Sequence, residues 1–289
     1  MTFYSPLRYP GGKAKLINYF KDLILKNNLL KGTYVEIYAG GASIALSLLI
    51  DGYVSKITIN DKDKSIFAFW KSIINYPKEI CDLIKKTPLN IKHWRIQKNI
   101  QKNKDNYDLE NKQDIITLGF STLFLNRTNR SGILNAGVIG GLKQTGEWKM
   151  NARYNKENLI SKINLISKYK KKIKLYNLDA VDLIKEIKNK LPKKTLIYLD
   201  PPYYYKGKEL YMNYYEYKDH KKIADAIKEI NTNWVVTYDD VGPINNLYVG
   251  FDNYSYLLNY SAANSGKGKE KIFFSHRMKH SSEGLLISN

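Results

Sequence analysis

The stretch Asp200-Pro201-Pro202-Tyr203 constrains the fold of this chain more than any other. It follows the apolar, partly β-branched run Thr195–Leu199, which predicts a buried strand of a parallel sheet. Two prolines end the strand, because neither can donate a hydrogen bond to a neighbouring strand. The sequence therefore predicts an acidic and an aromatic side chain at the carboxyl end of a central strand, where open α/β sheets bind ligands.

This corner suits the transfer of a group to the exocyclic amine of a nucleobase, a poor nucleophile because its lone pair is delocalised into the ring. Two acceptors for its N–H groups would draw the nitrogen towards tetrahedral geometry. Asp200 can supply one acceptor and the Pro201 carbonyl the other, while the ring of Tyr203 offers a face on which a base can stack. The alternative is a plain loop corner with Tyr203 in the core.

Residues 34–43, Tyr-Val-Glu-Ile-Tyr-Ala-Gly-Gly-Ala-Ser, predict a strand, a glycine turn and a helix with Ser43 as its N-cap. This is the first unit of an α/β fold that binds a nucleoside cofactor, in which glycine leaves room for the ligand. The next predicted strand, Ile57–Asn60, ends at Asp61, about twenty residues after the glycines, where an acid that binds ribose hydroxyls is expected. Capping of the following helix is the alternative for Asp61.

Shorter signals occur at other predicted element ends. Lys13 follows two glycines at the start of a predicted helix over 13–30, a suitable place to hold a carboxylate or phosphate. Asp179 follows a predicted strand over 173–177, where it could contact the adenine of a nucleoside cofactor or cap the next helix. His220 is predicted to lie on the surface. Residues 254–258 and 271–274 are predicted to form a closing antiparallel pair of strands.

From about residue 67 to 170 helical patterns dominate, at 65–74, 91–102 and 115–126, which predicts an inserted, mostly helical subdomain. Three of the chain's six arginines lie between 127 and 153, although the chain otherwise uses lysine. Arg and Asn side chains read guanine and adenine edges and also hold phosphates. The glycine-rich stretch after Asn126 is therefore predicted to contact DNA, with an ordinary loop of arginines paired to acids as the alternative.

The composition is consistent with a polyanionic partner. The formal charge is +20 and the pI is about 9.6, although the abundance of Asn, Ile, Tyr and Lys indicates that an AT-rich coding bias contributes to the charge. Cys81 is the single cysteine, which excludes an internal disulfide and a cysteine-rich zinc site and fits a reducing compartment. No apolar run approaches the ~18 residues of a spanning helix, and we expect a soluble cytoplasmic protein.

Four blocks occur in order: Tyr-Pro-Gly-Gly-Lys at 9–13, Glu-Ile-Tyr-Ala-Gly-Gly-Ala-Ser at 36–43, Asn-Arg-Thr-Asn-Arg-Ser-Gly at 126–132 and Asp-Pro-Pro-Tyr at 200–203. Together they resemble the Dam-type (D12 class) DNA adenine-N6 methyltransferases over nearly the whole chain. The resemblance implies a Rossmann-like α/β methyltransferase domain, residues 1–66 and 171–289, that uses S-adenosylmethionine. It also implies a target-recognition subdomain, residues 67–170, and a flipped adenine as substrate.

The motifs and the resemblance together give the candidate site residues, and no metal is expected. The catalytic candidates are Asp200, Pro201, Pro202 and Tyr203. The cofactor-binding candidates are Tyr9, Lys13, Glu36, Tyr38, Gly40, Gly41, Ser43, Asp61, Asp179 and Asp200. The DNA-binding candidates are Arg127, Asn129, Arg130, Ser131, Asn135, Arg153, Lys206 and Lys208.

The implied partner is double-stranded DNA, with GATC as a candidate recognition sequence and a cognate restriction endonuclease as a candidate partner. The chain departs from the family pattern by having Ala-Gly-Gly where many members have Gly-x-Gly, and Tyr9 where some have Trp. Two alternatives stay open. One is methylation of cytosine N4 or of an RNA base, and the other is a catalytically inactive methyltransferase scaffold that binds DNA.

Overall fold

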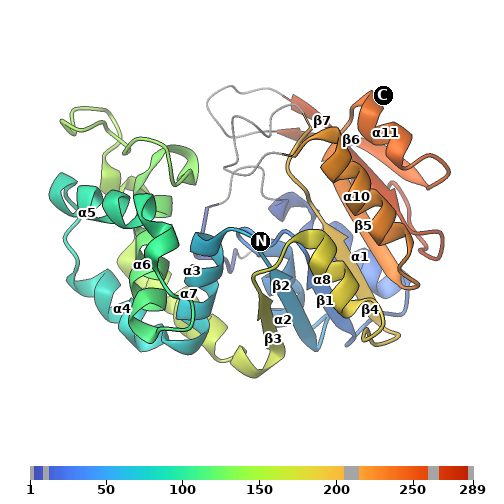
Figure 1. Cartoon of the computed structure of the whole chain (residues 1–289), viewed down its shortest axis with the longest axis horizontal. Helices are drawn as coiled ribbons and strands as arrows, with labels where there is room; N and C mark the ends of the chain where they lie inside the picture. The colour runs from blue at the N-terminus through green and yellow to red at the C-terminus, as the bar shows by residue number, and fades with distance from the viewer. Residues whose placement is uncertain (1–2, 9–12, 205–214, 260–266, 286–289) are drawn as a thin grey trace. The chain divides into compact units, whose positions relative to one another are not determined.

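The computed structural model describes residues 3–8, 13–204, 215–259 and 267–285. The chain divides into two compact units (Figure 1). The helical unit comprises Met1–Gly12 and Asp61–Asn177, and the sheet unit comprises Lys13–Asn60 and Leu178–Asn289.

The sheet unit contains six strands in the order β2-β1-β4-β5-β7-β6. They are β1 (Thr33–Glu36), β2 (Lys56–Asn60), β4 (Thr195–Leu199), β5 (Asn233–Asp239), β6 (Asn253–Asn259) and β7 (Lys267–Phe274). The first four in spatial order are parallel, and β7 runs antiparallel to both β5 and β6. This mixed sheet confirms the predicted Rossmann-like α/β fold and the predicted antiparallel pair.

Helices and short 3-10 turns connect these strands: η1 (Ala14–Leu16), α1 (Ile17–Lys26), α2 (Ser43–Ile50), α8 (Ala180–Ile187), α10 (Tyr217–Lys228) and α11 (Gly242–Leu247). Their apolar faces pack on the sheet, so all five residues of β4 are buried. Because β1, β4 and β5 are parallel, their carboxyl ends meet at one edge of the sheet. Strand β7 enters the same edge from the opposite direction, with Glu270 paired in register with Asp239 of β5.

The helical unit is built around α6 (Lys112–Thr128), which packs against α3 (Lys64–Asn75) and α5 (Ile91–Lys102). Its other elements are α4 (Pro77–Lys86), η2 (Lys104–Asn106), η3 (Arg130–Gly132), η4 (Met150–Arg153), α7 (Lys156–Ser167), η5 (Lys170–Lys172) and strand β3 (Ile173–Tyr176). The three predicted helices of this region are confirmed as α3, α5 and α6. Helices α4 and α7 were not predicted.

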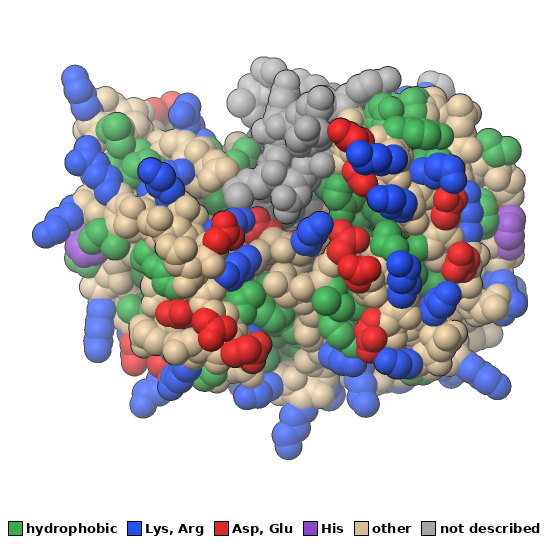
Figure 2. All heavy atoms as spheres, in the orientation of Figure 1, with side chains coloured by type: hydrophobic (Ala, Val, Ile, Leu, Met, Phe, Trp, Pro, Cys, Tyr) green, Lys and Arg blue, Asp and Glu red, His purple; other side chains and the backbone are tan. Residues whose placement is uncertain are grey.

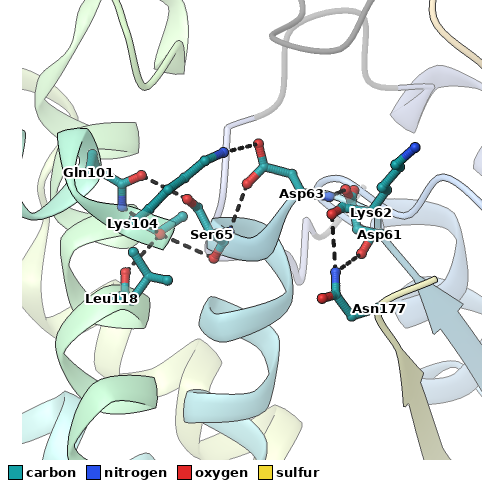
Figure 3. A network of polar contacts seen from close by, with 9 residues as sticks. Asp61, Lys62, Asp63, Ser65, Gln101, Lys104, Leu118 and Asn177 are labelled. Atoms are coloured by element: carbon teal, nitrogen blue, oxygen red, sulfur yellow. Dashed lines mark hydrogen bonds and ion pairs between the residues drawn. The ribbon is translucent and has the colours of Figure 1, made fainter. Parts of the chain in front are cut away.

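A polar network joins the three central helices of this unit (Figure 3). The hydroxyl of Ser65 in α3 donates to Gln101 Oε1 in α5 at 2.8 Å, and the Gln101 amide donates to Thr122 Oγ1 in α6 at 3.0 Å. Asp63 caps α3 by accepting from the Ser65 N–H at 2.7 Å, and Lys104 Nζ lies 3.4 Å from its other oxygen. These contacts fix the relative positions of the three helices. No helix in the described part of the chain is long and apolar enough to cross a membrane.

Candidate active site

Asp200 follows β4 directly, and one of its two carboxylate oxygens is held by two donors. Lys13 Nζ lies 2.9 Å from Asp200 Oδ1, and the Thr237 hydroxyl of β5 donates to the same atom at 2.7 Å. The described residues place no donor on Oδ2. The Asp200 side chain is 21% exposed. The orientation of the carboxylate is therefore fixed through Oδ1, while Oδ2 keeps its capacity to accept a hydrogen bond from a ligand.

Lys13 also binds a second carboxylate, that of Glu270 in β7. Lys13 Nζ lies 3.1 Å from Glu270 Oε2 and donates to the Tyr203 hydroxyl at 3.1 Å. The hydroxyls of Tyr203 and Tyr256 donate to the two Glu270 oxygens at 2.7 and 2.9 Å. Lys13 is 2% and Glu270 0% exposed. The Lys13 cluster, as we name it here, carries one positive and two negative charges in a buried setting and consists of Lys13, Asp200, Tyr203, Tyr256 and Glu270.

Burial and charge act in opposite directions on the ionisable groups of this cluster. Burial lowers the pKa of Lys13, but the carboxylates of Asp200 and Glu270 raise it more, and the net pKa lies well above its usual value. Burial raises the pKa of Asp200 above its ordinary value, although the Lys13 ammonium opposes this shift. Lys13 therefore stays charged at neutral pH, and Asp200 takes up a proton at a higher pH than an exposed aspartate.

The other members of the Asp-Pro-Pro-Tyr corner differ in accessibility. Pro201 is buried and Pro202 is half-buried. Tyr203 is only 3% exposed, and Lys13 Nζ lies over its ring, 5.0 Å from the centroid. In this structure the contribution of Tyr203 is its hydroxyl, which joins Lys13 to Glu270. Stacking of a base on its ring stays a prediction, and it requires the ring to be uncovered.

The predicted glycine turn is present between β1 and α2. Gly40 has φ +44° and Ala42 has φ +46°, so the chain passes through left-handed backbone that glycine adopts at low cost. The Ala39 N–H donates to the Asn60 carbonyl at 2.8 Å. The buried side chain of Asn60 also donates to the Ile37 carbonyl at 2.9 Å. Asn60, which was not predicted as a site residue, therefore fixes the turn at the end of β1.

The prediction that Ser43 caps α2 is wrong. Ala42 is the N-cap and provides no side-chain hydrogen bond, while Ser43 is the first helical residue. Glu36, from the end of β1, accepts from the Ala45 N–H at 3.1 Å and so replaces a local cap. Burial raises the pKa of Glu36 well above its ordinary value, the Ala45 bond opposes the shift, and the nearby Asp200 adds to it.

The remaining cofactor candidates occupy different settings. Asp179 caps α8 by accepting from the Val181 N–H at 3.0 Å, which was its alternative prediction. Burial raises the pKa of the Tyr38 phenol well above its ordinary value, and Tyr215 adds to this shift. The carboxylate of Asp179 is close enough to make a further, smaller contribution. Asp61 belongs to the helical unit, and it is not the cap of α3 because Asp63 fills that position. The Asp61 Oδ1 atom accepts a hydrogen bond from the Asp63 N–H at 2.9 Å. Tyr9 lies outside the described residues.

In the helical unit, the asparagines of the 126–132 stretch face inward. Asn129 is fully buried, where it accepts from Trp94 Nε1 at 2.7 Å and donates to the carbonyls of Ile133 and Leu134. The side chain of Asn126 accepts from the Arg8 N–H and donates to the carbonyls of Arg8 and Gly132. The amide of Asn129 is therefore committed to the fold and is not available to read a base in this structure.

The other DNA-binding candidates are more accessible. Arg130, Asn135 and Arg153 are exposed, Ser131 is half-buried with φ +55°, and Arg127 is half-buried at the end of α6. Lys206 and Lys208 lie outside the described residues. The Lys and Arg side chains are spread over the face shown in Figure 2, so net charge alone does not locate a DNA surface.

Four cations gather beside the N-terminal segment. Arg127 Nε donates to the Pro6 carbonyl at 2.6 Å and Lys162 Nζ to the Ser5 carbonyl at 3.3 Å. Burial, followed by the charge of Arg8 and to a smaller extent that of Arg153, lowers the pKa of Arg127 to about 10. Within the described residues none of the four is paired with a carboxylate. Arg8, Arg127, Arg153 and Lys162, here called the cationic cluster, can therefore receive an anion.

Comparison with known proteins identifies the family. The model of the D12 class N6 adenine-specific DNA methyltransferases matches residues 9–260, which is most of the chain. The chain belongs to this family. This D12 protein is therefore an adenine-specific DNA methyltransferase, in agreement with the resemblance of its four motifs. Residues 200–203, the candidate catalytic corner, lie within the matched range.

Other comparisons add little. No curated protein matches the sequence significantly. Among solved structures, the D12 chain is similar to the rRNA methyltransferase aviRa from Streptomyces viridochromogenes, with 7% identity, a TM-score of 0.36 and coverage of 90% of this chain and 84% of that one. It is also similar to a SAM-dependent methyltransferase from Agrobacterium tumefaciens, with 10% identity, a TM-score of 0.38 and coverage of 90% and 61%. These values are too low to support an argument about function.

The sequence did not single out four further candidate site residues, which are Glu270, Thr237, Arg8 and Lys162. A signal for Glu270 exists in the alternation of β7, where Glu270 shares a face with Ile272 and Phe274. Both of these neighbours are fully buried. The described residues contain no group of three or more His, Cys, Asp or Glu side chains suited to a metal ion.

The prediction that His220 lies on the surface is wrong. It lies in the first turn of α10 with no exposed area, its Nδ1 is 3.1 Å from the Tyr238 hydroxyl, and the ring of Tyr204 lies 5.4 Å from its own. Burial lowers the pKa of His220 to about 4. A buried neutral histidine therefore supports the packing next to the Asp-Pro-Pro-Tyr corner.

This histidine predicts a pH dependence of stability. Between pH 6.5 and 4 the unfolded chain binds a proton at His220 and the native protein does not, so stability falls as pH falls. The free energy of unfolding should decrease by about 2–3 kcal/mol across this range because of His220 alone. Urea unfolding at several pH values measures it. If His220→Gln shows the same dependence as the wild type, the assignment to His220 is wrong.

Proposed function

We propose that this D12 methyltransferase transfers a methyl group from S-adenosylmethionine to N6 of an adenine flipped out of duplex DNA. The observation that supports it most is the fixed carboxylate of Asp200, whose Oδ1 is held by Lys13 and Thr237 and whose Oδ2 accepts from no donor among the described residues. Flipping is part of the proposal because the amine cannot be reached within a stacked duplex.

In this proposal Asp200 Oδ2 accepts from one N6–H and the Pro201 carbonyl accepts from the other. The two acceptors direct the nitrogen lone pair towards the incoming methyl carbon, so that most of the catalysis is positioning. S-adenosylmethionine supplies a methyl carbon activated by the sulfonium. The nitrogen becomes positive as its bond to the methyl carbon forms and the bond between that carbon and the sulfur breaks, and the net negative charge of the Lys13 cluster stabilises that charge. The neutral thioether leaves, and the surplus N6 proton is then lost to water.

The residues at the carboxyl edge of the sheet fit this cofactor. The left-handed turn at Gly40 allows close approach of a ligand to the backbone. Glu36, Tyr38 and Asp179 offer oxygen atoms for the hydroxyl and amino groups of a nucleoside and an amino acid. The net charge of the Lys13 cluster also suits a cationic sulfonium. The cofactor roles of Tyr9, Lys13, Gly41, Ser43 and Asp61 stay predictions.

The cationic cluster supports DNA as the substrate, with residues 67–170 proposed as the target-recognition subdomain. Phosphate would supply the counter-charge that the described residues lack. Arg153→Ala should weaken binding to all duplex sequences by a similar factor and reduce the slope of log affinity against log salt by about one. The matched control is Arg95→Ala, which removes an exposed arginine of α5 in the same unit. Equal salt slopes for the two variants would contradict this role.

Labelled S-adenosylmethionine and unmethylated duplex DNA test the proposed function. Mass analysis of the nucleosides should find N6-methyladenine, and sequencing that maps modified bases should place it at one short motif. GATC is the candidate motif, and a restriction endonuclease with the same motif is the candidate partner. Only N4-methylcytosine, or methylation of RNA but not DNA, would refute the proposal. If calorimetry detects no binding of S-adenosylmethionine, an inactive scaffold that binds DNA would instead be favoured.

A further inference from the structure

Trp148 differs from the other three tryptophans of the chain in its exposure. It is 67% exposed, whereas Trp70, Trp94 and Trp234 are at most 9% exposed. Leu142 is 57% exposed and lies on the same loop, residues 133–149 between η3 and η4. A large aromatic side chain is seldom left in water in this way, and two exposed apolar residues on one short loop commonly mark a contact surface.

The loop that presents Trp148 is held in shape by Gln144. The Gln144 amide donates to the carbonyls of Ile139 and Gly141 at 2.8 and 2.7 Å, and its Oε1 accepts from the Met150 N–H at 3.0 Å. The Lys149 ammonium donates to the Gln144 carbonyl at 2.7 Å. The polar groups of the loop therefore stabilise its conformation, and none of these hydrogen bonds involves Trp148.

A cationic residue lies close to each end of this loop. At its start, the Arg130 N–H donates to the Gly137 carbonyl at 3.0 Å, next to the bridge between Asn129 and Val138. At its end, η4 closes with Arg153, a member of the cationic cluster. The loop itself carries Lys143 and Lys149 against a single acid, Glu147, so the net charge of the loop that bears the exposed indole is positive.

We propose that Trp148 stacks on a nucleobase of the DNA bound by the helical unit. This inference rests on the proposed DNA-binding function and adds a residue that contacts bases rather than phosphates. Positive surroundings favour a nucleic acid over an apolar protein surface. Every base has a π face, so such a contact adds affinity at a distorted or opened step without reading sequence.

The fluorescence of Trp148 provides a direct test, because the other three tryptophans are buried. The difference between wild type and Trp148→Phe isolates the Trp148 emission. Addition of duplex DNA should quench this emission and protect it from acrylamide. Trp148→Ala should weaken duplex binding roughly tenfold, as expected for the loss of one stacked base. Its salt slope should equal that of the wild type, and Trp148→Phe should bind nearly as well as the wild type.

The matched control is Ile96→Ala, which removes a 46% exposed apolar side chain of α5 in the same unit and should bind DNA as the wild type does. If the wild type binds DNA while the Trp148 emission and the affinity of Trp148→Ala are unchanged, the inference is wrong and the proposed function stands. If the wild type binds no DNA, both are wrong. Protection of Trp148 by rising protein concentration without DNA would make it a protein interface and also overturn the inference.

Discussion

Replacing Asp200 with alanine is expected to reduce the single-turnover rate of methyl transfer by roughly 10²–10³-fold or more, the scale known for removal of one preorganised polar group. The substitution removes the open Oδ2 acceptor that the proposal gives to the adenine amine. It leaves Lys13 with its second partner, Glu270, so the buried ammonium keeps a counter-charge. Duplex binding, measured by anisotropy with a labelled oligonucleotide, should therefore survive.

Asp200→Asn separates the acceptor from the charge. Asparagine keeps a carbonyl oxygen but loses the negative charge that balances Lys13 and the nitrogen. We expect a rate between those of the wild type and the alanine variant. For the wild type, the rate should fall as pH falls, at a higher pH than an exposed aspartate would give, because burial raises the pKa of Asp200. Turnover of Asp200→Ala at the wild-type rate would refute the mechanism.

Lys13→Met is expected to lower the free energy of unfolding by about 3–5 kcal/mol, the usual cost of removing one partner from a buried ion pair. The variant leaves the carboxylates of Asp200 and Glu270 facing each other without an ammonium. It also removes the charge that opposes the upward shift in the pKa of Asp200. Since a raised native pKa means that the folded state binds more protons, this variant should gain stability as pH falls from 8 towards 5.

The double variant Lys13→Met with Glu270→Gln provides the control. Removing the second carboxylate charge should recover part of the lost stability, so the two substitutions should be non-additive by more than about 1 kcal/mol. Guanidinium unfolding of the wild type, both single variants and the double variant completes the cycle. Additive effects would mean that Lys13 and Glu270 do not interact as their 3.1 Å separation indicates.

Features determined by short-range pattern were predictable from the sequence. Strand β4 was predicted at its observed bounds, because an apolar run followed by two prolines leaves little choice. The glycine turn at Gly40 was likewise local. Ser43 was mistaken for a cap because the actual acceptor, Glu36, comes from the preceding strand. The capping rule considers only residues next to the helix start, whereas here the helix N–H is bound by a side chain nine residues earlier in the sequence.

Glu270 and Asn129 show why part of the site was missed or misassigned. Glu270 lies in a lysine-rich stretch that is typical of a solvated loop, but in the sheet it is paired with Asp239 of β5 on one side and Tyr256 of β6 on the other, and it is fully buried. Asn129 has a residue type and a position that suit base reading, but Trp94, distant in sequence, takes up its amide oxygen. In both cases the contacts of the side chain are made with partners that are distant in the sequence, so a local pattern does not identify them.

The pairing of residue 13 with residue 270 also bears on biosynthesis. The ammonium and the carboxylate come from the first helix region and the last strand of the sheet unit, so they meet only after β7 has emerged from the ribosome. Until then a nascent chain carries Lys13 and Asp200 without the second carboxylate and without the hydroxyl of Tyr256. The Lys13 cluster is therefore completed only after β7 has been synthesised, and no amino-terminal fragment that lacks β7 contains the whole cluster.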